Sequence, residues 1–235
     1  MINATDARIK KLLNQTQLIR AFVAKNNVFY KGLKLFKISF FYLQMNSIHQ
    51  KILIITAPSG AGKTSITRHL MKVFPVLEFS ISAATRQARE NEQYGVDYYF
   101  MTLEDFNQKI QQKEFAEWEM VYEGKYYGTL KSELKRIWGL HKIPVLDIDV
   151  KGALHIQKQY PENTLSIFVQ PPSVEVLKNR LEGRGTETKQ SLEARVSKAS
   201  YELSFKDHFD KTVVNEDLGK ACAEAEKLVA EFLNN

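Results

Sequence analysis

Ala57-Pro58-Ser59-Gly60-Ala61-Gly62-Lys63-Thr64 follows an apolar run at Ile52–Thr56, and this combination is the strongest indication of the fold. The run is short and rich in β-branched residues, as in a strand buried on both faces. A helix is expected directly afterwards, from Thr64 to Phe74, because Pro75 would interrupt it. A glycine-rich turn between a strand and a helix can direct several backbone N–H groups at one anion.

This turn is predicted to be a phosphate-binding loop, whose usual pattern is G-x-x-x-x-G-K-[ST]. Ala57 replaces the first glycine, but that position follows the strand and does not strictly require a positive φ. Lys63 is expected to reach the β- and γ-phosphates, and Thr64 to bind Mg²⁺ directly. An incidental glycine-rich turn is the alternative. The predicted ATP site comprises Ala57, Pro58, Ser59, Gly60, Ala61, Gly62, Lys63, Thr64 and Ser65.

The rest of the chain reads as an α/β fold, in which strands alternate with helices and form a parallel, helix-covered sheet. Residues 82–132 depart from this alternation and are dense in Tyr, Glu and Gly, which predicts a small inserted lobe. Helices are expected to begin at the capping residues Thr102 and Ser173, and a last helix to end near Leu233. Further strands are predicted at Val76–Ser82, Ile143–Val150, Thr164–Gln170 and Lys211–Asn215.

Composition excludes several classes of protein. Hydrophobic residues make up 44% of the chain and charged residues 26%, so a packed core is feasible and global disorder is not expected. The single cysteine, Cys222, excludes an intrachain disulfide and, with five scattered His, a Cys-based metal cluster. No run reaches the roughly 18 apolar residues that span a bilayer. We therefore expect a cytoplasmic protein without stable membrane association.

The net charge of +6 first suggests a nucleic-acid partner, but its distribution argues against one. Residues 1–50 contain eight Lys or Arg and one acidic residue, which gives +7. The remaining 25 basic and 26 acidic residues give −1. The body of the chain therefore lacks the basic surface that nucleic acids require, and we expect no such partner.

The first fifty residues differ from the rest and admit three interpretations. They could form an amphipathic helix, with Ile9, Leu12 and Val23 near helical spacing, that contacts a membrane or the body. They could be a targeting peptide, although they contain only two Arg and two Ser. Finally, the protein could begin at Met45. We expect residues 1–50 to be a poorly ordered extension or a misassigned start.

Six further stretches follow the phosphate loop in a distinctive order, namely Ser80–Arg89, Gly95–Phe100, Glu114–Trp118, Tyr126–Thr129, Leu146–Asp149 and Leu181–Thr186. Through these stretches, the sequence from about Lys51 to Asn235 closely resembles guanylate kinases. The resemblance implies a P-loop kinase that transfers the γ-phosphoryl group of ATP to GMP, with Mg²⁺, in purine nucleotide metabolism. It implies a domain over residues 51–235, with a core at 51–81, 133–171 and 201–235, a GMP-binding lobe at 82–132 and a helical lid at 172–200.

The resemblance also assigns a GMP site, and the residue types suit it chemically. Arg86 and Arg89 can clamp a phosphate dianion through their guanidinium groups. Glu117 is expected to recognise the base, since one carboxylate can accept hydrogen bonds from both N1–H and the 2-amino group of guanine. Adenine lacks this pair of adjacent donors. The other residues implied at this site are Ser82, Tyr98, Tyr127, Thr129, Asp147 and Asp149.

Asp147 and Asp149 lie two residues apart at the end of a predicted strand, so both are expected to point to one face. The resemblance implies that Asp147 faces guanine and that Asp149 lies nearer the phosphates and Mg²⁺, which it would contact through water. The lid would supply Arg180, Arg184 and Arg195, which with Lys63 are the predicted catalytic residues. No general base is expected, because the GMP phosphate is already anionic.

Three other functions compete with this interpretation. A guanylate-kinase-like binding module would keep the fold, but such modules typically lose the phosphate loop that is present here. A P-loop kinase for AMP or a phosphorylated sugar is disfavoured by Glu117 and the paired tyrosines. A basic RNA-binding protein is disfavoured by the charge of the body. The sequence leaves open the use of dGMP and the oligomeric state.

Overall fold

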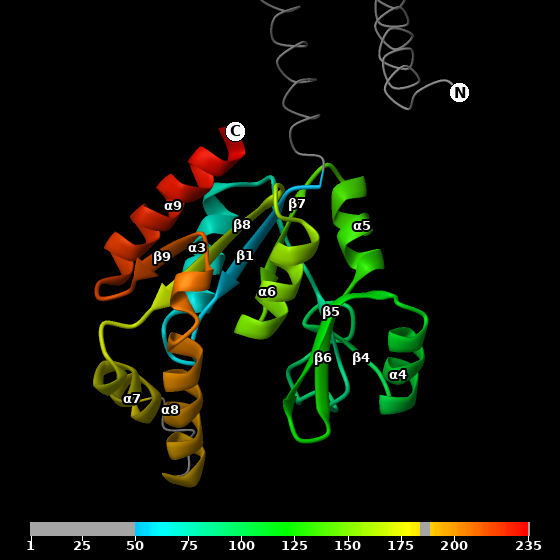
Figure 1. The fold of residues 1–235 in the computed structure, drawn as a ribbon, viewed down its shortest axis with the longest axis horizontal. Coiled ribbons are helices and arrows are strands. Elements are labelled where there is room, and N and C mark those ends of the chain that lie inside the picture. Colours follow the sequence, from blue (N-terminus) through cyan, green and yellow to red (C-terminus); the bar gives the residue numbers. More distant parts are fainter. Residues whose placement is uncertain (1–49, 184–188, 235) are drawn as a thin grey trace, which may run out of the picture. The chain divides into compact units, whose positions relative to one another are not determined.

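A five-stranded parallel sheet with the order β2-β7-β1-β8-β9 forms the centre of the fold (Figure 1). The computed structural model describes residues 50–183 and 189–234, which all belong to one unit of the chain, Ser47–Asn235. The expected α/β fold is confirmed, as are the strands at Ile52–Thr56 and Thr164–Gln170. The strands are β1 (Ile52–Thr56), β2 (Leu77–Phe79), β7 (Ile143–Asp147), β8 (Thr164–Gln170) and β9 (Lys211–Val214).

Helices cover both faces of this sheet because successive side chains of β1 point to opposite sides. Leu53 and Ile55 join a core cluster with helices α3 (Lys63–Val73) and α9 (Leu218–Asn234). Ile52 and Ile54 join a second cluster with α5 (Lys131–Gly139) and α6 (Val150–Gln159). All five residues of β1 are buried, so the strand that carries the phosphate loop is rigidly held.

A second, four-stranded sheet builds the lobe, which we define as residues 82–130. Its strand order is β4-β3-β6-β5, and helix α4 (Leu103–Gln111) packs on it through the buried Phe106. Thr102 caps α4 as predicted, since its side chain accepts from the Asp105 N–H at 3.0 Å. The strands are β3 (Ser82–Ala84), β4 (Tyr98–Phe100), β5 (Phe115–Tyr122) and β6 (Lys125–Leu130).

Three predicted strands were too long, and one of them, Lys211–Asn215, exceeds β9 by a single residue. The stretch Val76–Ser82 is not one strand: β2 ends at Phe79 in the core sheet, and β3 begins at Ser82 in the lobe. The predicted strand Ile143–Val150 ends at Asp147, because the Asp149 side chain caps α6 by accepting from the Gly152 N–H at 3.0 Å. Asp149 keeps an extended backbone, as residues that cap helices usually do, but the strand pairing of β7 ends at Asp147.

Two further helices lie opposite the lobe in Figure 1, namely α7 (Val174–Glu182) and α8 (Lys189–Leu203). The Ser173 side chain caps α7 as predicted, accepting from the Val176 N–H at 3.2 Å. A short 3₁₀ turn, η1 (Lys206–His208), precedes β9. Arg184 and the first 49 residues, including Met45, lie outside the described residues. In the described part of the chain, no helix is both long and apolar enough to span a membrane.

Candidate active site

The phosphate loop depends on two glycines in left-handed backbone conformations. Gly60 has φ +92° and Gly62 has φ +101°, which L side chains rarely adopt. A Cβ atom on Gly62 would also lie 2.1 Å from the Asn215 side-chain nitrogen, so no larger residue fits. Ala57 is outside the set of residues with positive φ, and this explains why alanine is tolerated where the usual pattern has glycine.

A cleft of about 410 Å³ extends from this loop to the lobe. It brings together phosphate-loop residues, lobe residues, both aspartates near the end of β7 and one arginine of α8. The predicted residues that line it are Ala57, Pro58, Ser59, Gly60, Gly62, Lys63, Thr64, Ser65, Ser82, Tyr98, Glu117, Tyr127, Asp147, Asp149 and Arg195. Ala61 and Thr129 are fully buried nearby, whereas Arg86, Arg89 and Arg180 do not line this cleft.

Lys63 forms an ion pair with Asp147 at the floor of the cleft. Asp147 ends β7 beside β1, its backbone in register with Ile55, so the carboxyl end of one strand faces the loop that leaves the other. Each side chain is 22% exposed, and the pair is therefore accessible to a ligand. An anionic phosphate entering the loop would compete with Asp147 for the lysine.

Glu117 is a buried carboxylate, only 6% exposed, at the lobe end of the cleft. It lies on β5 opposite Thr129 on β6, whose hydroxyl donates to Glu117 Oε1 at 2.6 Å. Burial raises the pKa of Glu117 to about 7, although the Thr129 hydrogen bond lowers it, and the nearby Asp149 charge adds to the rise. The charge of Glu117 therefore changes close to neutral pH.

The first turn of α6 approaches Glu117 closely because residue 152 is glycine. A Cβ atom there would lie 2.5 Å from Glu117 Oε2. Gly152 was not singled out from the sequence, although a glycine in the first turn of a helix is a recognisable signal, since it disfavours the helix.

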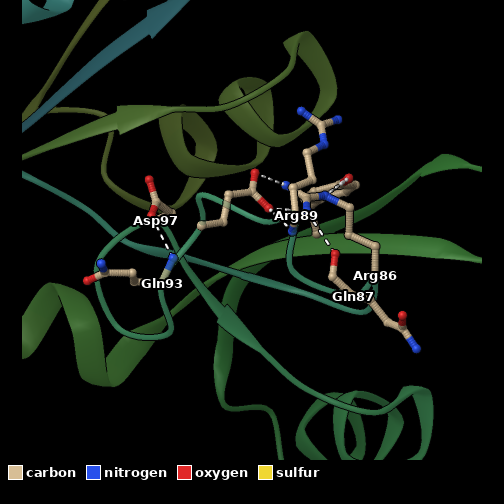
Figure 2. A network of polar contacts seen from close by, with 7 residues as sticks. Arg86, Gln87, Arg89, Gln93 and Asp97 are labelled. Atoms are coloured by element: carbon tan, nitrogen blue, oxygen red, sulfur yellow. Dashed lines mark hydrogen bonds and ion pairs between the residues drawn. The ribbon is translucent and has the colours of Figure 1, made fainter.

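Arg86 is engaged within the lobe in this structure (Figure 2). Its guanidinium donates to Glu92 through Nη1 at 2.5 Å and Nη2 at 2.7 Å, and to the Tyr127 hydroxyl through Nε at 3.1 Å. It also lies 4.8 Å from the centre of the Tyr98 ring. These hydrogen bonds raise the pKa of Arg86 and lower that of Glu92 to about 2.

Arg89 is on the same loop, but its side chain is exposed, so the two arginines do not form a closed clamp here. The Arg89 N–H donates to Glu92 at 2.9 Å, while the Gln93 N–H donates to Asp97 at 2.8 Å (Figure 2). Glu92 thus occupies the place beside Arg86 where the sequence suggested a phosphate. The sequence contained a signal for it, a carboxylate six residues after Arg86 in the same polar loop.

Helix α8 presents three charged residues to the cleft at helical spacing. Arg195 Nη1 donates to the Ser59 hydroxyl at 2.9 Å, which joins the helix to the phosphate loop. Lys198 and Glu202 also line the cleft and lie 3.6 Å apart. Glu202 is 6% exposed, and burial raises its pKa. Lys198 and Glu202 were missed from the sequence, although the spacing 195, 198 and 202 marks one helix face.

A second cleft of about 360 Å³ lies on another side of the phosphate loop and is lined by Gly60, Gly62, Arg180 and Asn215. Arg180 Nη2 donates to the Asn215 backbone oxygen at 2.9 Å, so this predicted lid arginine faces the second cleft. Asn215 Nδ2 donates to the Ala61 oxygen at 2.7 Å. Its Oδ1 atom is buried without a hydrogen-bond partner among the described residues. Asn215 was not predicted from the sequence.

Comparisons with known proteins agree with one another. The family model described as guanylate kinase matches residues 49–232. The guanylate kinase of Bacteroides fragilis is 45% identical over 183 residues, covering 78% of this chain and 90% of that protein. That of Bacteroides thetaiotaomicron is 44% identical over 199 residues, covering 85% and 98%. The crystal structure of guanylate kinase from Anaplasma phagocytophilum has a TM-score of 0.64 at 27% identity, covering 79% and 87%.

Proposed function

The chain belongs to the guanylate kinase family, and on that premise we propose that its cleft transfers the γ-phosphoryl group of ATP to GMP. The products are ADP and GDP. One observation supports this most directly: a single cleft is lined by the phosphate loop at one end and by the buried Glu117 at the other. Two nucleotides held at these ends would meet phosphate to phosphate.

Glu117 would select the base of GMP. Its carboxylate can accept from the two adjacent donors of guanine, while the Thr129 hydroxyl fixes its orientation. Adenine would leave it unpaired in a buried site, which is the kind of mismatch that gives strong discrimination. Ser82 lines the same end and can donate to the base.

The phosphate of GMP would lie near Arg86, Tyr98 and Tyr127. The two tyrosines line the cleft, and Arg86 contacts both of them. Phosphate would then take the guanidinium donors that Glu92 holds in this structure, with Arg89 joining from the same loop. A planar guanidinium suits this exchange, since it pairs with carboxylate and phosphate alike.

ATP would bind with its phosphates in the loop from Ala57 to Ser65 and its nucleoside in the second cleft. GMP would occupy the end of the first cleft near Glu117, so the adenosine of ATP must extend from the phosphate loop in another direction. Arg180 can stack on a base, and the unpartnered Asn215 Oδ1 can accept from an amino group.

Magnesium fits the donors near the loop. No cluster of three or more His, Cys, Asp or Glu within residues 50–183 and 189–234 could hold a metal ion by itself. The Mg²⁺ of a kinase does not need such a cluster, because the ion is bound mainly by substrate phosphates and water. The Thr64 hydroxyl would bind it directly, and Asp149 through water, using the oxygen that does not cap α6. When bound, the ion neutralises phosphate charge.

The protein's own part in the transfer is positioning and charge neutralisation. Lys63, once released from Asp147, would hold the transferring group, and Arg195 would approach it from α8 beside Ser59. Arg184 stays a prediction outside the described residues. Closure of α8 over both nucleotides would exclude water and limit ATP hydrolysis.

The experiment is an ADP-release assay with ATP and Mg²⁺ and each of GMP, dGMP, AMP, CMP and UMP. We expect turnover with GMP to exceed that with AMP by at least about a hundredfold, as for a site built on hydrogen bonds to the base. Equal rates with AMP, or none with GMP, would contradict the proposal. Phosphopeptide binding without turnover would instead favour a binding module. The cytoplasmic location expected from the sequence stays a prediction.

A further inference from the structure

The lobe is joined to the core at two crossings of the chain. The first is the pair Ser80–Ile81, between β2 of the core sheet and β3 of the lobe sheet. The second is the step from Leu130 to Lys131, where β6 passes directly into α5. Among the described residues, these are the two places where the backbone passes between lobe and core, although β5 of the lobe also packs against α6 of the core.

Glu133 connects both crossings. It lies in the first turn of α5, two residues after Lys131, and its side chain is only 1% exposed. Its Oε1 atom accepts from the Ile81 backbone N–H at 3.1 Å. One carboxylate therefore stands at the second crossing and binds the backbone of the first.

The same carboxylate also holds the lobe itself. Tyr99, on strand β4, donates its hydroxyl to Glu133 Oε2 at 2.9 Å. On the solvent side, Arg136 donates to both oxygens, through Nε at 2.9 Å and Nη2 at 2.8 Å. Glu133 is thus fixed to its own helix by Arg136 and to the lobe by Tyr99.

These partners keep a deeply buried group charged. Burial alone would raise the pKa of Glu133, but hydrogen bonds from Arg136, the Ile81 N–H and Tyr99 outweigh it and hold the pKa below its ordinary value. A buried charge is strongly destabilising when one partner is removed. Because charge-assisted hydrogen bonds are directional, this network favours one orientation of the crossing and of β4 relative to α5.

We propose that Glu133 is the pivot of the lobe, a positioning residue that sets the orientation of residues 82–130 relative to the core sheet. That orientation determines how far Glu117 and Arg86 lie from the phosphate loop. The proposal rests on the proposed function, because the separation of Glu117 and Arg86 from the phosphate loop matters for catalysis only if two nucleotides react across the cleft. In-line transfer is sensitive to such placement, and an error of about 1 Å can cost about a hundredfold in rate.

The kinetic test compares Glu133→Gln with two other variants. Glu133→Gln keeps the shape but removes the charge, and Tyr99→Phe removes only the hydroxyl that reaches from the lobe. The matched control is Glu78→Gln, on the neighbouring strand β2, which breaks the Glu78–Lys142 pair within the core. We expect kcat/KM for GMP to fall at least about tenfold in Glu133→Gln and less in Tyr99→Phe. The KM for ATP should change less than about twofold, and the control should match wild type.

A distance measurement tests the pivot without relying on activity. Spin labels on Glu104→Cys in the lobe and Lys227→Cys in the core, with the native thiol removed by Cys222→Ala, report the distance between the two parts. We expect a broader or shifted distribution in Glu133→Gln than in wild type, with saturating GMP restoring the wild-type one. If Glu133→Gln does not fold, Tyr99→Phe provides the same comparison.

Two outcomes would overturn the pivot: an unchanged distance distribution in the folded variants, or a changed distribution with unaltered kcat/KM for GMP. If wild type does not phosphorylate GMP, the proposed function fails, and the nucleotide-free distributions still decide whether Glu133 orients the lobe. The failure of one proposal is therefore distinguishable from failure of the other.

Discussion

Thr129 and Glu117 face each other on paired strands of the lobe, and the Thr129 hydroxyl donates a 2.6 Å hydrogen bond to the buried carboxylate. This bond favours the ionised form, whereas burial opposes it, and the balance leaves the pKa of Glu117 at about 7. The group proposed to read guanine therefore changes charge near neutral pH.

The first prediction is that GMP binding weakens as pH falls through 7. A protonated Glu117 cannot accept from both guanine donors, so only the ionised fraction binds well. For one group with a pKa near 7, the KM for GMP should rise about tenfold between pH 8 and pH 6. Glu117→Gln is the control. The phosphate of GMP titrates near pH 6 with both wild type and variant, so only the additional pH dependence caused by Glu117 should disappear in the variant. A pH profile identical in both proteins would contradict this assignment.

The second prediction concerns folding stability. The pKa of Glu117 is raised from its ordinary value of about 4.5, so the native state binds its proton more tightly than the unfolded chain. This favours folding below about pH 4.5, and the advantage is lost as pH rises through 7. Glu117→Gln should therefore raise the unfolding free energy at pH 8, by on the order of 1–3 kcal/mol, and far less near pH 4. Denaturant unfolding at both pH values measures this difference in free energy. A loss of stability in Glu117→Gln at pH 8 would argue against a carboxylate charge that is destabilised by burial.

Third, Lys63→Ala should lower kcat by at least about a hundredfold while leaving the fold intact, because it removes the cation proposed to hold the transferring phosphate. Lys72→Ala is a matched control, since Lys72 is an exposed lysine in the last turn of the same helix. Steady-state kinetics and circular dichroism provide the comparison. Near-normal turnover in Lys63→Ala would remove this lysine from the mechanism.

Fourth, Arg86→Lys should raise the KM for GMP about tenfold or more, although the charge is retained. A lysine cannot reproduce the paired donors toward Glu92 or phosphate, nor the contacts with Tyr98 and Tyr127. The KM for ATP should stay within about twofold. The same change at the exposed Arg68 on α3 should leave both constants unchanged. Equal effects on GMP and ATP would indicate general damage instead.

Fifth, Gly152→Ala should impair GMP use even though alanine favours helices by about 1 kcal/mol. The new Cβ atom would lie 2.5 Å from Glu117 Oε2 and must displace the carboxylate. Gly139→Ala, in α5, meets no atom within 4 Å and is the control, with unchanged KM and equal or higher stability. If both variants behave alike in GMP titrations, the close approach of α6 has no functional consequence.

Local patterns predicted those parts of the site that are contiguous in the sequence. The strand, the glycine-rich turn and the following helix were recognisable because backbone conformation there depends on residue type: Gly60 and Gly62 adopt positive φ as such a loop requires. The helix caps at Thr102 and Ser173 were predicted for the same reason, since a cap involves only near neighbours. The position of Glu117 in the cleft came from family resemblance, whereas the two aspartates were also indicated by their spacing at the end of a predicted parallel strand.

Contacts between segments distant in sequence could be seen only in the folded chain. No local signal indicates that Glu133 binds the backbone of Ile81, 52 residues away, or that Asn215 supports the phosphate loop across 154 residues. The end of β7 was misjudged because Asp149 caps a helix that packs against the lobe. The phosphate loop could be predicted from local sequence, because its conformation is set by adjacent residues. The contacts of Glu133, the Arg86–Glu92 pair and the buried environment of Glu117 could not, because burial and hydrogen bonding there depend on which elements the folded chain packs together.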